Sequence, residues 1–243
     1  MVKDRPRISS PLRLTPAFQL FKPSKDLVLK HIWIFGPLYA VFVFFSIHSW
    51  LWSPTGPGVK HHWWQSTGVS IPWGPDPVSI DYAFVGFTVF WFLFTIIVGT
   101  IVQIMSQKAQ LEAAEGKNPA FDKLWGTVKE MWLKMIGLYI VVTAVIIIGF
   151  FLIIIPGIFM VKRYFMSTYV MLDHKNLSIR QAMDKSAAMS PSTDAIWGVV
   201  LVGILFGIIS VIPVVGWLIG GVLSILYSVA PALRYQELKR LTA

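Results

Sequence analysis

The sequence predicts an all-α protein that crosses a membrane several times. Of its 243 residues, 55% are hydrophobic and only 14% are charged, whereas an ordinary soluble domain is about 25% charged. Mean hydropathy is +0.65, and the apolar residues gather in runs long enough for a helix to cross about 30 Å of hydrocarbon. A soluble body of this length could not bury so much apolar surface. These observations exclude a soluble enzyme, a disordered chain and a nucleic-acid-binding domain.

Five apolar runs are long enough to cross a bilayer, and a sixth is short. The long runs cover residues 31–52, 80–105, 131–155, 195–212 and 214–233. The short run, 157–172, extends about 24 Å at 1.5 Å per residue, and it carries Lys162 and Arg163. Whether this segment is a full crossing or a re-entrant one is the main uncertainty in the predicted topology.

The distribution of basic residues favours six crossings. If all six segments cross, eighteen lysines and arginines lie on one side and only Lys60 lies on the other. If 157–172 does not cross, the division becomes twelve to seven. Excess Lys and Arg in short loops marks the cytoplasmic side. We therefore predict six transmembrane helices in the cell (inner) membrane, with both termini cytoplasmic.

This topology divides the chain into three parts. Residues 1–30 form a basic cytoplasmic N-terminal arm, and residues 31–105 hold the first two crossings with an outer loop. Residues 106–243 form a four-helix membrane domain. The outer loop is rich in Pro and Gly, which disfavour regular helix, and five tryptophans lie in or beside it, at positions 50, 52, 63, 64 and 73. These indoles form either an aromatic belt at the headgroup level or a surface for a partner or ligand.

Two cytoplasmic links are predicted to contain helices that lie at the membrane interface. In the first, apolar residues recur at helical spacing and lead into the third crossing; they are Phe121, Leu124, Trp125, Val128 and Trp132. In the second, Ser178 and Gln181 have the spacing of a capping box, so a short helix should begin there. Pro191 should end it.

Small residues predict where the crossings pack. Helices in lipid associate where small side chains let their backbones approach. The fifth and sixth crossings should form a tight antiparallel hairpin through Gly203, Gly207, Gly216, Gly220, Ser224 and Ser228. Pro156, Gly157 and Pro213 should lie in turns that end crossings.

Residues 105–243 contain a set of short motifs in a fixed order. They are Ile-Ile-Pro-Gly-Ile at 154–158, Val-Lys-Arg-Tyr at 161–164, Tyr-Val-Met-Leu-Asp at 169–173, Ala182 with Ser186, and Leu-Arg-Tyr at 233–235. This part of the chain resembles a family of six-helix bacterial membrane proteins, typified by the membrane domain attached to some glycerophosphoryl diester phosphodiesterases. The family often has Glu at the position of Asp173, and an aromatic-basic dipeptide near Ile196 and Trp197.

The resemblance covers somewhat over half of the chain, and it implies a membrane-embedded domain that serves as an anchor or a lipid-handling module. No phosphodiesterase catalytic domain accompanies it in this sequence, so that activity is not implied here.

Lys162 and Arg163 are the most unusual polar residues, because a charge within a crossing is costly. They are expected about a turn and a half inside the outer end of the fourth crossing. One interpretation is that both side chains extend to the interface. The other is a site for an anionic lipid head group or a partner, in which Arg163 binds phosphate in a bidentate fashion and Lys162 supplies a point charge.

The sequence offers little that could carry catalysis. It contains no readable nucleophile arrangement and no phosphate-binding or zinc-protease motif. His48, His61 and His62 are a weak metal signal without an ordered carboxylate partner. We therefore expect no enzyme activity, no cofactor, no metal and no nucleic-acid partner.

Three functions remain from the sequence. The first is a non-enzymatic integral membrane protein that interacts with anionic lipid or with another membrane protein. The second is a passive transporter or channel for a small solute, for which the available lining residues are Thr95, Gln103, Thr143, Ser224 and Ser228. The third is an accessory subunit of a larger membrane complex, bound through the Trp-rich outer loop.

Overall fold

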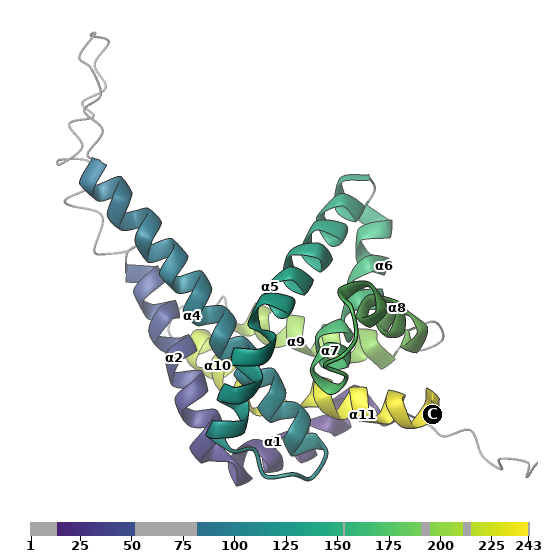
Figure 1. Cartoon of the computed structure of the whole chain (residues 1–243). Helices are drawn as coiled ribbons and strands as arrows, with labels where there is room; N and C mark the ends of the chain where they lie inside the picture. The colour runs from purple at the N-terminus through teal and green to yellow at the C-terminus, as the bar shows by residue number, and fades with distance from the viewer. Residues whose placement is uncertain (1–13, 52–81, 153, 191–194, 211–214, 243) are drawn as a thin grey trace, which may run out of the picture.

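The computed structural model describes residues 14–51, 82–152, 154–190, 195–210 and 215–242. Every regular element within these ranges is a helix (Figure 1). The predicted all-α class is therefore confirmed for the described part of the chain. The Trp-rich outer loop, Pro191 and Pro213 lie outside it.

Three helical stretches among the described residues are long and apolar enough to cross a membrane. They are Val89–Ala114, Phe121–Leu152 and Leu218–Thr242. A fourth is counted if Ala17–Lys30 and Ile32–Phe45 are taken as one stretch, although these two are bent by 95° relative to each other. The model is thus compatible with a membrane protein, and six crossings stay a prediction.

The second and third predicted crossings are longer than expected. Helix α4, Tyr82–Ala114, continues well past residue 105. A turn with Gly116 at φ 75° follows, a conformation that glycine adopts without steric cost. Helix α5, Phe121–Leu152, then joins the predicted interfacial segment and the third crossing into one helix. Figure 1 shows α4 and α5 meeting at one end of the molecule and diverging toward the other.

The predicted single helix over 157–172 is wrong. The structure divides this segment into α6, Ile154–Tyr164, and α7, Ser167–Asp173, with a turn at residues 165–166. Pro156 and Gly157 lie in the first turns of α6 instead of in a turn that ends a crossing, and proline is tolerated in a first helical turn. A Cβ on Gly157 would lie 2.5 Å from Cγ of Phe150, so glycine is needed where α6 packs against α5.

The N-terminal arm contains helices that the sequence analysis did not foresee. A 3-10 helix, η1, covers Ala17–Leu20, and α1 covers Phe21–Lys30. The Ser24 hydroxyl donates to the Leu226 carbonyl at 2.7 Å and accepts from the Val229 N–H at 3.2 Å. Ser24 thereby links α1 to the turn between α10, Val215–Tyr227, and α11, Ala230–Thr242.

An aromatic cluster holds the same region together. Phe21 of α1 lies 6.4 Å, between ring centroids, from Phe206 of α9, Ala195–Ser210. Tyr227 stacks on Phe21, and its hydroxyl donates to the Ala17 carbonyl at 2.9 Å. Residues 17–30 therefore pack into the bundle through the described contacts. Helix α2, Ile32–Leu51, follows after the bend at His31.

The antiparallel pairing of α9 and α10 is confirmed, but only some of the small residues that were predicted to form the contact take part in it. Ser210 lies beside Gly220 while Phe206 lies beside Tyr227, so the two helices run in opposite directions. A Cβ at Gly203 or Gly207 would meet no described atom within 4 Å, so their predicted close contact is wrong. Ser224 is exposed, Gly216 is buried, and the Ser228 Oγ is buried on the side that faces Tyr39.

Gly220 is the residue on which the α9–α10 contact depends. A Cβ there would lie 2.7 Å from the Phe206 carbonyl oxygen and 2.8 Å from the Ser210 backbone nitrogen. We expect Gly220→Ala to lower the free energy of unfolding by about 1–3 kcal/mol, because backbone atoms must move to admit the methyl group. Thermal unfolding in detergent measures this.

Gly221→Ala is the matched control, since a Cβ at Gly221 meets no described atom within 4 Å. It should leave stability unchanged or raise it by about 0.5–1 kcal/mol, because alanine loses less backbone entropy in a helix. Equal stability of the two variants would contradict the close contact.

Candidate functional site

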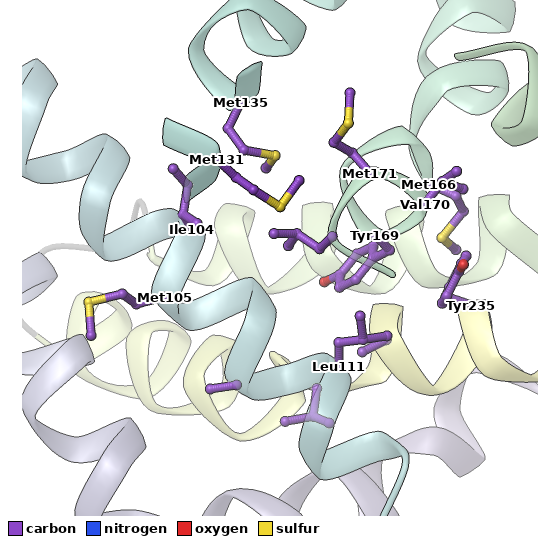
Figure 2. Packing of buried hydrophobic residues seen from close by; sticks show 14 of the residues in the cluster. Ile104, Met105, Leu111, Met131, Met135, Met166, Tyr169, Val170, Met171 and Tyr235 are labelled. Atoms are coloured by element: carbon purple, nitrogen blue, oxygen red, sulfur yellow. The ribbon is translucent and has the colours of Figure 1, made fainter. Parts of the chain in front are cut away.

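The centre of the molecule is the short helix α7. Five of its seven residues are buried, and it contacts α4, α5 and α8, Ile179–Met189. Figure 2 shows Met131 and Met135 of α5 on one side of Tyr169 and Tyr235 of α11 on the other. The chain therefore passes through the interior at this point, and the residues on either side of α7 are held in place.

A polar cluster lies inside this apolar core. The Tyr169 hydroxyl donates to Oε1 of Gln110 at 2.8 Å. Nε2 of Gln110 donates to Ser106 Oγ at 3.1 Å and to the Tyr39 hydroxyl at 3.4 Å. This connected group joins α2, α4 and α7. Each hydrogen bond satisfies a polar group that burial would otherwise penalise.

This cluster was not predicted from the sequence. The available signal was the pair Ser106 and Gln110, which are four residues apart in one helix and so share one face. Of the predicted lining residues, Ser228 lies beside the Tyr39 hydroxyl of this cluster, whereas two others lie apart from it. The Thr95 hydroxyl donates to the Trp91 carbonyl of its own helix at 2.9 Å, and Thr143 is exposed.

Asp173, at the end of α7, forms a second polar cluster. It accepts hydrogen bonds from the Tyr235 hydroxyl at 2.7 Å and from Lys239 Nζ at 2.6 Å. His174 Nε2 lies 3.5 Å away. Burial alone would raise the pKa of Asp173, but the bonds from Lys239 and Tyr235 outweigh it and lower that pKa below its ordinary value.

The structure brings together residues from motifs that are distant in sequence. Tyr169 and Tyr235 stack with their ring centroids 6.0 Å apart. Ala182 is buried, and Ser186 Oγ donates to the Arg163 carbonyl at 2.9 Å. Four of the motifs that carry the family resemblance therefore contribute to one packed region.

Arg234, from the last motif, is also buried. It pairs with Glu237 at 2.5 Å and donates to the Thr15 carbonyl. Through Arg234 the C-terminal helix holds the N-terminal segment against the bundle.

Lys162 and Arg163 lie at the C-terminal end of α6, against α8. Besides the Ser186 bond to the Arg163 carbonyl, Ser190 Oγ donates to the Lys162 carbonyl at 3.4 Å. The predicted place near the outer end of a crossing stays a prediction, and in the structure α6 packs against α8.

The side chains of this pair are available for a ligand. Arg163 is exposed, with its guanidinium carbon 5.9 Å from the centroid of the Tyr164 ring, and Lys162 is half-buried. Neither side chain forms an ion pair with any residue that the structure describes. The site thus holds two cations without a protein counter-charge among the described residues.

The capping box of α8 is confirmed in both directions. The Ser178 hydroxyl accepts from the Gln181 N–H, and the Gln181 side chain accepts from the Ser178 N–H. The loop before α8 is basic as well. Lys175 forms an ion pair with Glu130, and Lys134 Nζ donates to the Lys175 carbonyl at 3.2 Å.

The metal signal cannot be placed in this structure. The side chain of His48, and all of His61 and His62, lie outside the described residues. In the part that is described, no three His, Cys, Asp or Glu side chains are arranged to hold a metal ion.

The chain matches no protein-family model, no curated protein and no solved structure. The resemblance to the phosphodiesterase-linked membrane domains therefore stays a prediction.

The bond between Tyr169 and Gln110 yields a direct test. Tyr169→Phe leaves Oε1 of Gln110 buried without this donor, so we expect the free energy of unfolding to fall by about 1–3 kcal/mol. Tyr164→Phe is the control, because its hydroxyl makes no hydrogen bond with the described residues. Thermal unfolding in detergent measures both variants, and equal stability of the two would contradict the role of Tyr169.

Asp173 predicts a dependence of stability on pH. Its folded pKa lies below the ordinary 3.8, so its contribution is present above pH 3.8 and is lost as the pH falls through the folded pKa. Asp173→Asn should be less stable than the parent at neutral pH. Between pH 5 and pH 3, its melting temperature should fall less than that of the parent. This range extends about one unit either side of an ordinary carboxyl pKa. Parallel melting curves across this range would contradict the assignment.

Proposed function

We propose that the protein is a non-enzymatic integral membrane protein that binds anionic lipid head groups at the end of α6, through Lys162 and Arg163. The carrying observation is the face of α6 on which these cations lie. Ile158 and Phe159 are 40% and 61% exposed, and they precede Lys162 and Arg163 by four residues, which is one helical turn on the same face. An apolar surface is therefore followed directly by two cations. A phospholipid has the matching order, since its apolar acyl chains are followed by its anionic phosphate.

The adjoining end of α5 extends this apolar surface. Phe150, Phe151 and Leu152 are 43%, 87% and 73% exposed, and α5 packs along α6. Exposed apolar patches of this kind mark lipid or protein contact sites. Lipid acyl chains are suited to the exposed apolar surface of α5 and α6 because they need no specific polar partner.

The two cations are suited to a phosphate group in different ways. A guanidinium can form two parallel hydrogen bonds to phosphate oxygens, whereas an ammonium acts as a compact point charge. The C-terminal end of a helix carries a partial negative charge that favours nearby cations. The bonds from Ser186 and Ser190 fix the backbone of the pair, so less ordering is needed when a head group binds.

Several contacts support the proposed topology of six crossings with both termini cytoplasmic. The ion pair of Lys175 with Glu130 joins the link after α7 to the start of α5. Gln236 donates to Glu115 at 3.1 Å, which joins the tail to the end of α4. Arg234 joins the same tail to Thr15. All four basic regions are thus linked by contacts, as expected if they share one side of the membrane.

The alternatives have less support. A passive pathway needs polar residues that line one continuous route. Ser228 joins the polar cluster at Tyr39, but Thr143 and Ser224 are exposed and the Thr95 hydroxyl bonds to its own helix. An accessory subunit would dock through the Trp-rich loop, which lies outside the described residues. A membrane-protein partner on the α5–α6 hairpin is a possible outcome of the following test.

We expect Lys162→Gln with Arg163→Gln to reduce the anionic lipid that co-purifies with the protein. Each cation near an anionic surface contributes about 1 kcal/mol, so the loss should be severalfold. Lipid mass spectrometry after mild detergent extraction measures it. Lys117→Gln with Lys123→Gln is the control, since it removes equal charge from exposed positions elsewhere. Unchanged lipid retention, or loss of a stoichiometric protein instead, would contradict the proposal.

A further inference from the structure

We propose that α1 lies flat on the cytoplasmic leaflet and binds its anionic phospholipid head groups. This contact is separate from the one at α6 and involves other residues. It shares with the proposed function only the membrane setting. The inference rests on the two faces of α1 and on its angle to α2.

One face of α1 is fixed to the protein. Ser24 and Val28 are buried, as is Leu20 just before the helix. Ser24 makes the two hydrogen bonds to the turn between α10 and α11, and Tyr227 bonds to the Ala17 carbonyl. The helix is therefore held in one orientation, and its opposite face points away from the bundle.

That opposite face combines lysines with large apolar side chains. Lys22, Lys25 and Leu29 lie at i, i+3 and i+7, so they share one side of the helix. Leu29 is 53% exposed, and Phe18, four residues before Lys22, is 64% exposed. Lys30 is exposed as well, and Asp26 is the one acidic residue of the helix. An amphipathic surface with this composition suits the boundary between head groups and acyl chains.

The angle between α1 and α2 gives the surface its orientation. The two helices are bent by 95° at His31. If α2 crosses the bilayer, a helix at a right angle to it runs parallel to the membrane surface. Trp33, at the start of α2, is 88% exposed, and an indole at that position favours the headgroup level.

The mixture of residues favours lipid over protein as the occupant. Interfaces between proteins are depleted in lysine relative to the rest of the surface. Lysines that alternate with leucine and phenylalanine can instead place their stems along acyl chains and their ammonium groups among phosphates. Three lysines against one aspartate also complement an anionic leaflet.

The absence of cysteine in the sequence allows a direct measurement. Leu29→Cys carries a spin label in bilayers of phosphatidylcholine mixed with phosphatidylglycerol, and its collisions with oxygen and with a water-soluble nickel complex are compared. We expect oxygen, which partitions into lipid, to be favoured severalfold. Lys117→Cys is the reference for a water-exposed position, since the Lys117 side chain is 68% exposed. A second label at Phe18→Cys should behave like the label at position 29.

The charges are tested in the same assay. Lys22→Gln with Lys30→Gln should lower the oxygen preference at position 29 severalfold in the mixed bilayers. In phosphatidylcholine alone it should change little. Lys123→Gln with Arg180→Gln, which removes two exposed cations elsewhere, should have no effect.

Three results would overturn the proposal. A label at position 29 as accessible to nickel as the label at position 117 would place α1 in water. Shielding from both reagents would indicate a protein contact. An unchanged oxygen preference after loss of both lysines would exclude anionic lipid as the binding partner of α1. Lys162→Gln with Arg163→Gln should not alter the label, so failure at α6 and failure at α1 can be told apart.

Discussion

The hydrogen bond from Tyr169 to Gln110 is the contact on which the rest of the arrangement depends. It fixes α7 against α4 in the interior of the bundle, where an unpaired hydroxyl or amide is costly. Because α7 is only seven residues long, its position also determines where α6 ends and where the next link begins.

Lys162 and Arg163 lie just before the turn that separates α6 from α7, and their carbonyls contact α8. In a continuous crossing these cations would lie within the hydrocarbon, at a cost that insertion measurements place at about 2.5–3.5 kcal/mol per residue at the helix centre. The break allows α6 to end early, and hydroxyls from Ser186 and Ser190 then satisfy carbonyls at that end. The end of α6, where both cations lie, is therefore held by side-chain hydroxyls of α8.

The sequence predicted those features that are encoded locally. The length of the apolar runs predicted α4 and α5. The capping box of Ser178 and Gln181 predicted the start of α8. Both signals lie within a short segment of sequence. It did not predict the break at residues 165–166, since no proline or glycine stands there and the break depends on distant partners. The pattern of small residues showed that α9 and α10 could approach, but Gly220 makes the contact while Gly203 and Gly207 do not.

The basic N-terminal segment shows how distant contacts change the meaning of a local composition. Its lysines alone suggest a solvated arm, but bonds from Arg234 and Tyr227 to backbone carbonyls at residues 15 and 17 hold it against the bundle. A fixed helix loses less conformational freedom on meeting a membrane than a free arm does. The same reasoning applies to Lys162 and Arg163 at the end of α6. Placing both sets of cations on packed helices therefore favours lipid contacts in a defined orientation over general attraction to the leaflet.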